Sequence, residues 1–290
     1  MRWTPGGSTG DVEDRRGQSG PGLGGLPIPI GGLGGGGLVV VVIIFVLLKV
    51  LGGGGGFDPG GLNGLPQAGS GGSGLQGAPD SEAKLKDFMV YVFNDVQDFW
   101  VEQFAPTQRG YDRAKLVLYT NATSTGCGVG QASAGPFYCP TDQKVYLDLG
   151  FFAELRDRFK ANGDFAQAYV VAHELGHHVQ NLLGISDKVH AEAQKTGAKS
   201  LSVRLELQAD CLAGVWAHTV FTRGDLEAGD VEEALTAAAS VGDDRIQQQS
   251  SGEVHPESFT HGTSEQRQHW FKAGFDSGSS DNCDTFSGDI

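Results

Sequence analysis

Basic residues are scarce in this chain. Lysine and arginine number 21 against 35 aspartates and glutamates, which gives a formal net charge of −14 at pH 7. A surface of this sign repels the phosphate backbone of nucleic acids, so we expect no nucleic-acid partner. The acidity itself implies no particular ligand, because a high net charge also keeps an exported domain soluble.

The stretch 1–80 lacks the side chains that a hydrophobic core needs. It contains 27 of the 46 glycines of the chain. So few apolar side chains cannot offset the conformational entropy that folding removes. We therefore predict a disordered, glycine-rich segment over 1–27 and a flexible Gly/Ser/Pro-rich linker over 52–79. Residues 80–290 are long enough to form a single compact domain.

Charge is absent between Arg16 and Lys49, and residues 38–48 are an uninterrupted run of large apolar side chains. Extended over 28–51, this run reaches the ~20 residues that a helix needs to span a bilayer, and we predict a single transmembrane anchor. A cleaved signal peptide is the first alternative, disfavoured because the run begins only at Leu38. A buried core strand is the second, disfavoured by the glycine tracts on both sides.

The distribution of basic residues predicts the orientation of the anchor. Arg2, Arg15 and Arg16 precede the apolar run, whereas Lys49 is the only basic residue between the run and Lys84. Basic residues flanking a span tend to stay on the cytoplasmic side. We therefore expect a single-pass protein of the cell membrane, with a cytoplasmic N-terminus and a periplasmic or extracellular domain.

Cysteine is also rare, with only Cys127, Cys139, Cys211 and Cys283. An even number of cysteines in an exported domain favours disulfides. The short separation of Cys127 and Cys139 favours that pair and leaves Cys211 with Cys283 as the default, although sequence alone permits three connectivities. A zinc thiolate at Cys211 is the alternative interpretation.

Apolar residues recur at helical spacing in much of the domain. The segments predicted as helices are 81–104, 164–183, 200–221, 231–249 and one that begins at Thr263 or Ser264. Thr263 and Gln266 have the spacing of a capping box at the start of the last helix. Alternating patterns over 115–120 and 144–149 predict two strands. The fold class is therefore α+β, with helices predominating over a small sheet.

Residues 172–178 read Ala-His-Glu-Leu-Gly-His-His within the predicted helix 164–183. One helical turn separates His173 from His177, so the two imidazoles can share one metal ion. Zinc binds imidazole nitrogen and, in catalytic sites, needs only three protein ligands beside water. H-E-x-x-H on a helix is the signature of zinc metallopeptidases. We therefore predict one Zn²⁺ per chain, with Glu174 as the base that takes a proton from water.

A third ligand is expected from the helix over 200–221. Glu206 and Asp210 lie one turn apart on this helix, which follows the H-E-x-x-H helix in the chain. We predict Glu206 as the third zinc ligand. Asp210 is then placed to accept the free N–H of a ligating histidine, which fixes the tautomer of that ring. The alternative is that both carboxylates are solvated residues of a surface helix.

These motifs resemble those of the neutral zinc metallopeptidase family, membrane-anchored bacterial proteins of the zincin superfamily. The likeness is carried by residues 173–178, 206–214 and 261–267, together with Gly-Pro-Phe-Tyr-Cys-Pro at 135–140 and Val-Tyr-Leu-Asp at 145–148. The resemblance implies a zincin-like domain that hydrolyses peptide bonds. The arrangement H-E-x-x-H…E-x-x-x-D is also similar to the glutamate zincins, in which the glutamate is the third ligand.

His261 and Arg267 are similar to the His-Pro…Arg element that membrane-integrated zinc peptidases place near their metal. Gly262 stands where those families have proline, so the likeness is partial. It implies that His261 hydrogen-bonds the developing oxyanion and that Arg267 supports it. The alternative is a polar loop that caps the following helix.

Together these patterns predict a membrane-anchored zinc endopeptidase acting on peptide or protein substrates. We expect the substrate to align along an exposed edge strand, for which 145–149 is the candidate. A catalytically silent, membrane-tethered protein that binds zinc or peptides is the main alternative. Glu174 disfavours it, because a structural zinc site has no use for that carboxylate. A scaffold protein with a chance motif is disfavoured by the matching Glu206 and Asp210.

Overall fold

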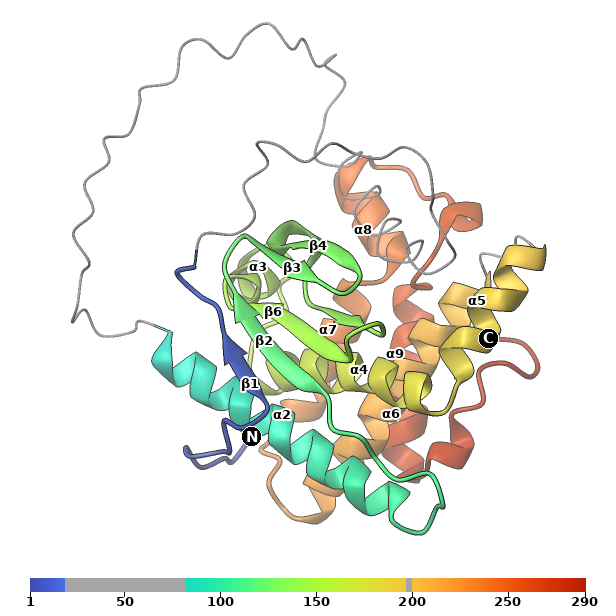
Figure 1. The fold of residues 1–290 in the computed structure, drawn as a ribbon. Helices are drawn as coiled ribbons and strands as arrows, with labels where there is room; N and C mark the ends of the chain where they lie inside the picture. Colours follow the sequence, from blue (N-terminus) through green and yellow to red (C-terminus); the bar gives the residue numbers. More distant parts are fainter. Residues whose placement is uncertain (19–81, 197–199) are drawn as a thin grey trace, which may run out of the picture.

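The computed structural model describes residues 1–18, 82–196 and 200–290. Within these ranges helices predominate, beside a four-stranded sheet and a separate hairpin (Figure 1). The predicted fold class, α+β with mostly helices and a small sheet, is confirmed. None of the helices in these ranges combines the length and apolar character needed to cross a membrane. The predicted anchor over 28–51 and the linker over 52–79 lie outside the described residues.

The sheet has the strand order β1-β2-β6-β5. Its members are β1 (Val12–Asp14), β2 (Lys115–Tyr119), β6 (Lys144–Asp148) and β5 (Phe137–Cys139). The first three are parallel, and β5 runs antiparallel to β6. Strands β2 and β6 confirm the two predicted strands. However, β6 lies between β2 and β5, so the expectation that 145–149 forms an exposed edge is wrong, and β5 forms the edge beyond it.

Both predicted disulfides are present. Cys127 lies at the turn of a hairpin formed by β3 (Ala122–Thr125) and β4 (Gly128–Gln131), and it is bonded to Cys139 in β5. A short 3₁₀ turn, η1 (Ala132–Ala134), leads from the hairpin into β5. Cys211 is bonded to Cys283. This bond removes the alternative in which Cys211 ligates zinc.

The helices follow the predicted apolar segments with three exceptions. They are α2 (Ala83–Phe104), α3 (Phe151–Asp157), α4 (Asp164–Leu182), α5 (Ile185–Thr196), α6 (Ser200–Thr222), α7 (Asp230–Ser240), α8 (Asp243–Ser250) and α9 (Ser264–Ser277), with 3₁₀ turns η2 (Pro256–Ser258) and η3 (Ser280–Asn282). Helices α3 and α5 were not predicted. The single helix expected over 231–249 is two, because the backbone is extended at Gly242. The capping box of Thr263 and Gln266 is confirmed.

Helix α4 occupies the centre of the domain. It contacts α2, α5, α6, α7 and β5 (Figure 1). Its buried apolar residues recur at spacings of three and four, as predicted, and include Phe165, Tyr169, Ala172, Leu175 and Val179. The buried face holds the helix against its neighbours, and this fixes the position of the H-E-x-x-H residues that the same helix carries.

Residues 1–18 are part of the domain, which contradicts the disorder predicted for them. Val12 pairs with Leu116 across the β1–β2 ladder. The Trp3 ring lies 5.1 Å from the Phe88 ring on α2. The Met1 ammonium group lies 2.6 Å from Asp164 Oδ1 at the start of α4. These contacts could not be predicted from local patterns, because partners distant in the chain supply them.

The pairing of β1 with β2 bears on the predicted single-span topology, which stays a prediction because residues 28–51 lie outside the described ranges. A chain that crossed a bilayer once between residues 18 and 82 would leave β1 and β2 on opposite sides. The basic residues used to infer a cytoplasmic N-terminus instead bind the domain. Arg2 donates to the Gly224 carbonyl, and Arg16 forms an ion pair with Glu82. These contacts give the basic side chains a part in folding.

The packing of α6 against α9 gives a first prediction. The two helices approach so closely that a Cβ atom added to Gly274 would lie 1.9 Å from the Cys211 carbonyl oxygen. We expect Gly274→Ala to lower the free energy of unfolding by about 1–3 kcal/mol, because the overpacking exceeds the gain in helix propensity. Urea unfolding measures the change. Lys272→Ala, on the exposed side of α9, is the control, with an expected change below about 0.5 kcal/mol. Equal loss in both variants would contradict the close approach.

Candidate metal centre

The three predicted ligands converge on one point. Helix α4 places the rings of His173 and His177 with their centroids 4.8 Å apart. Helix α6 brings Glu206 against both, with Oε2 3.2 Å from His173 Nε2 and Oε1 3.5 Å from His177 Nε2. The ligand atoms of all three side chains lie within 4.8 Å of one another.

The geometry fits a zinc ion. Two ligands held at ~2.0–2.1 Å by a tetrahedral ion are separated from each other by about 3.3 Å. The nitrogen–oxygen distances of 3.2 and 3.5 Å at Glu206 agree with that separation. Two imidazoles and one carboxylate are also a ligand set of catalytic zinc sites, in which the fourth position is left to water or substrate. The group can therefore hold zinc with one position open.

Gly176 explains why α6 can approach the motif helix. A Cβ atom added to Gly176 would lie 3.0 Å from the Ala209 carbonyl oxygen and 3.2 Å from the Ala209 Cβ. The two helices therefore touch at Gly176 and Ala209. Since Ala209 lies between Glu206 and Asp210 in the chain, this contact brings both carboxylates to the histidines.

Asp210 is completely buried and accepts the Nδ1–H of His173 at 2.8 Å. It also accepts the hydroxyl proton of Tyr169 at 2.5 Å. The bond to Nδ1 leaves Nε2 of His173 directed at the metal position, as expected for an outer-shell carboxylate. Burial favours the neutral imidazole, but Asp210 raises the pKa of His173 to about 10. Zinc would therefore replace a proton at Nε2 when it binds.

Arg267 lies in the same buried network. Its Nε donates to Asp210 Oδ2 at 2.8 Å, and its Nη2 donates to Asp210 Oδ1 at 2.9 Å and to the Tyr169 hydroxyl at 3.1 Å. Burial opposes ionisation of Asp210, yet the charge of Arg267 holds the pKa of that carboxyl below its usual range. Arg267 therefore acts on His173 through Asp210, whereas the resemblance implied that it would support His261.

The two glutamates of the site have opposite electrostatic environments. Burial raises the pKa of Glu174, although the neighbouring imidazoles partly offset this effect. Burial also disfavours the charged form of Glu206, but the attraction and hydrogen bonds of His177 and His173 hold its pKa well below the usual range. Such a pair suits separate roles, with Glu206 a permanently ionised ligand and Glu174 a group able to carry a proton.

His261 lies in the loop before α9 and is fixed by Asp243, the first residue of α8. Its Nδ1 lies 3.0 Å from Asp243 Oδ1, and its backbone N–H donates to Asp243 Oδ2 at 2.6 Å. The charges of His261 and Glu206 interact, and each favours the ionised form of the other. Burial lowers the pKa of His261, but the bond to Asp243 gives a net rise. Thr263 in the same loop caps α9, so the helix cap does not require the side chain of His261.

Two residues of the site were not predicted from the sequence. Asp243 was read only as part of a helix, and Gln180, which accepts the Nδ1–H of His177 at 2.9 Å, was not considered. The spacing of Gln180 three residues after a predicted ligand was the one available signal. His178, which follows the ligand His177, is fully buried and makes a different contact, with Nε2 2.6 Å from the Asp112 carbonyl oxygen.

Proteins similar to this chain are known from several bacteria. A profile of the family described as "Putative neutral zinc metallopeptidase" matches residues 1–286. The chain is 47% identical over 299 residues to "Uncharacterized protein YpfJ" of Escherichia coli strain K12, with 100% of each covered. It is 46% identical over 210 residues to "Uncharacterized protein Rv2575" of Mycobacterium tuberculosis strain H37Rv, covering 69% of this chain and 70% of that protein. No solved structure is significantly similar. The chain therefore belongs to the neutral zinc metallopeptidase family.

Proposed function

We propose that this protein is a zinc endopeptidase. The observation that carries the proposal is the convergence of His173, His177 and Glu206 within 4.8 Å, beside Glu174 on the motif helix. A structural zinc is usually closed by four protein ligands, whereas three ligands leave a position for chemistry. Membership of a family named for this activity supports the same conclusion.

The protein groups have distinct parts in the proposed reaction. Zinc held by the three ligands would polarise the scissile carbonyl and lower the pKa of water to ~7. Glu174 accepts the proton of the attacking water and then delivers it to the leaving amine. His261, oriented by Asp243, donates a hydrogen bond to the carbonyl oxygen as negative charge develops there. Asp210 keeps His173 in the tautomer that ligates the metal.

We place the substrate chain along β5 rather than β6. Among the described strands, β5 pairs only with β6, and it contacts the motif helix α4. An extended peptide can add to such an edge through main-chain hydrogen bonds. The disulfide between Cys127 and Cys139 holds this edge in place.

Metal content and cleavage together test the proposal. The full-length protein in detergent is required, because β1 belongs to the sheet and a fragment of residues 80–290 would lack it. We expect one zinc per chain in the wild type and loss of zinc in His173→Ala. Digestion of a peptide library should produce internal cuts, which a chelator stops and added zinc restores. Zinc without cleavage would favour the silent zinc- or peptide-binding alternative, and absence of zinc would contradict the metal site.

We also propose that the apolar run over 38–48 holds the protein at a membrane, with residues 1–18 and 82–290 on the same side. The β1–β2 pairing supports a common side, and the two disulfides support an oxidising compartment, outside the cytoplasm. We expect Ser8→Cys and Glu253→Cys, both exposed positions, to react equally with an impermeant maleimide in intact bacterial cells. Labelling of only one position would contradict a common side and favour the single-span topology. The unmodified chain is the control, because its four cysteines are all bonded.

A further inference from the structure

The second histidine ligand has a polar partner of its own. Nδ1 of His177 lies 2.9 Å from Oε1 of Gln180, one turn further along α4. The amide nitrogen of Gln180 donates to the Leu205 carbonyl oxygen at 2.7 Å. Since a carbonyl can only accept, this contact fixes which end of the amide is NH₂. The oxygen must then face His177, whose Nδ1 carries the proton and whose Nε2 faces the metal position.

Gln180 is oriented in turn by Gln208 on α6. The nitrogen of Gln180 also donates to Gln208 Oε1 at 3.1 Å. The nitrogen of Gln208 donates to the backbone carbonyl of Cys283 at 3.0 Å. This carbonyl, again only an acceptor, fixes the Gln208 amide. All donors therefore point the same way, from His177 through two amides to Cys283.

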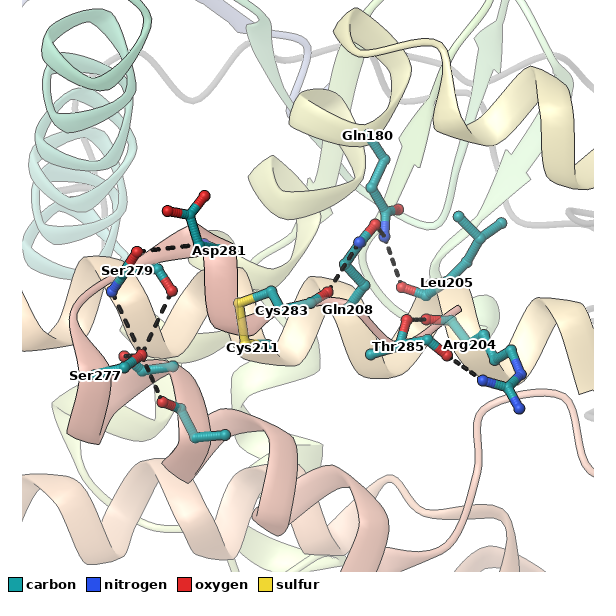
Figure 2. The surroundings of a disulfide bond; sticks show 12 residues. Gln180, Arg204, Leu205, Gln208, Cys211, Ser277, Ser279, Asp281, Cys283 and Thr285 are labelled. Carbon is teal, nitrogen blue, oxygen red and sulfur yellow. Dashed lines mark hydrogen bonds between the residues drawn. A yellow bond between two sulfur atoms is a disulfide. The ribbon is translucent and has the colours of Figure 1, made fainter. Parts of the chain in front are cut away.

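The C-terminal segment that supplies this last acceptor is attached to α6 by the disulfide. Figure 2 shows the Cys211–Cys283 bond beside Gln208, with Gln180 beyond it. Cys211 lies three residues after Gln208 on α6, so the bond delivers the Cys283 carbonyl to the next turn of the same helix. Thr285 adds a second attachment, since its hydroxyl donates to the Arg204 carbonyl at 2.6 Å.

The two glutamines and the disulfide in this series of hydrogen bonds are shielded from water. Gln180, Cys211 and Cys283 are 0–1% exposed, and Gln208 is 8% exposed. Water therefore cannot readily replace a lost partner in this region. Buried amides bonded in series also polarise one another, so that loss of one member weakens the next. Displacing the Cys283 carbonyl should therefore weaken the hydrogen bond that Gln180 accepts from His177.

We infer that the Cys211–Cys283 disulfide, acting through Gln208 and Gln180, positions His177 for zinc and thereby increases zinc affinity. Gln180 and Gln208 are positioning residues that contact neither metal nor substrate. The inference rests on the proposed metal site but does not require peptidase activity. On the other histidine ligand, Asp210 accepts the Nδ1–H of His173 and is not one of the residues that link His177 to Cys283.

Zinc affinity, measured by competition with a chromogenic chelator on the full-length protein, tests the inference. We expect Gln208→Met, which keeps the side-chain length, and the pair Cys211→Ala/Cys283→Ala each to weaken zinc binding about 10-fold, the lower end of the range for outer-shell partners. The other disulfide supplies a matched control, and Cys127→Ala/Cys139→Ala should bind zinc as the wild type does. If the Cys211/Cys283 pair fails to fold, as judged by circular dichroism, Gln208→Met alone decides.

Histidine-selective ¹⁵N NMR of the zinc-loaded protein separates positioning from general destabilisation. In Gln208→Met the Nδ1 proton of His177 should exchange faster with solvent, whereas that of His173, bonded to Asp210, should not change. Unaltered zinc affinity in Gln208→Met, or equal loss with both disulfides, would overturn the inference. A wild type that binds no zinc would refute the metal site and the inference with it. Zinc binding without peptide cleavage would refute only the peptidase activity.

Discussion

Glu174→Gln is expected to lower kcat/KM for peptide hydrolysis by about 10²–10⁴-fold, the contribution typical of a positioned general base. The amide has nearly the shape of the carboxylate but cannot accept the proton of water. Burial raises the pKa of Glu174, which favours uptake of the proton from the attacking water. Progress curves for a fluorogenic peptide selected from the library digest measure the change.

The zinc content identifies the cause of this loss. Since Glu174 is not one of the three converging ligands, Glu174→Gln should still bind one zinc per chain. Glu154→Gln, an exposed glutamate on α3, is the matched control and should retain full activity. A Glu174→Gln protein that bound zinc and cleaved peptides at more than about a tenth of the wild-type rate would exclude this residue as the base.

The parts of the site that could be predicted from sequence are those encoded by local spacing. His173 and His177 share a face of α4 because of the helical repeat, and Glu206 and Asp210 share a face of α6 for the same reason. The convergence of the two helices depends on their contact at Gly176. That contact is tertiary, so spacing could indicate Glu206 as a candidate ligand, and the resemblance to a known family supported the choice.

The residues that were missed each depend on a partner far away in the chain. Asp243 reaches His261 across 18 residues, and Gln180 reaches Gln208 across 28. A periodic sequence pattern cannot indicate such long-range bonds. Aspartate and glutamine also occur at many exposed helix positions, so the residue type alone gives no signal. The bonds become visible only when both partners are placed and the buried amides must be satisfied.

The N-terminal strand was missed for a different reason. β1 has only three residues, Val12–Asp14, and two of them are acidic, so it lacks the alternation that predicts a strand. Its stability comes from the parallel ladder with β2 and from contacts such as Lys144 to Glu13 at 2.6 Å. The glycine content, averaged over the stretch 1–80, therefore wrongly predicted disorder for residues 1–18.

Arg267→Met is expected to lower the free energy of unfolding by about 3–5 kcal/mol, the cost of leaving a buried charge without its partner. Arg267 is 3% exposed and Asp210 0%, and two hydrogen bonds join them. Urea unfolding of the zinc-free protein measures the change without a contribution from metal binding. Arg156→Met is the control, because that arginine pairs with Asp157 at a solvent-exposed position, where such pairs contribute little to stability.

A second substitution shows whether charge or packing causes the loss. In Arg267→Met/Asp210→Asn the buried negative charge is removed, while the side-chain oxygen can still accept from Tyr169 and His173. If the unpaired carboxylate is the cause, this double variant will be more stable than Arg267→Met alone. If the double variant is the less stable of the two, the loss arises from the packing of the arginine. In that second case the ion pair of Arg267 and Asp210 contributes little to folding. Its role is then to hold Asp210 against His173, and breaking it should lower the zinc affinity.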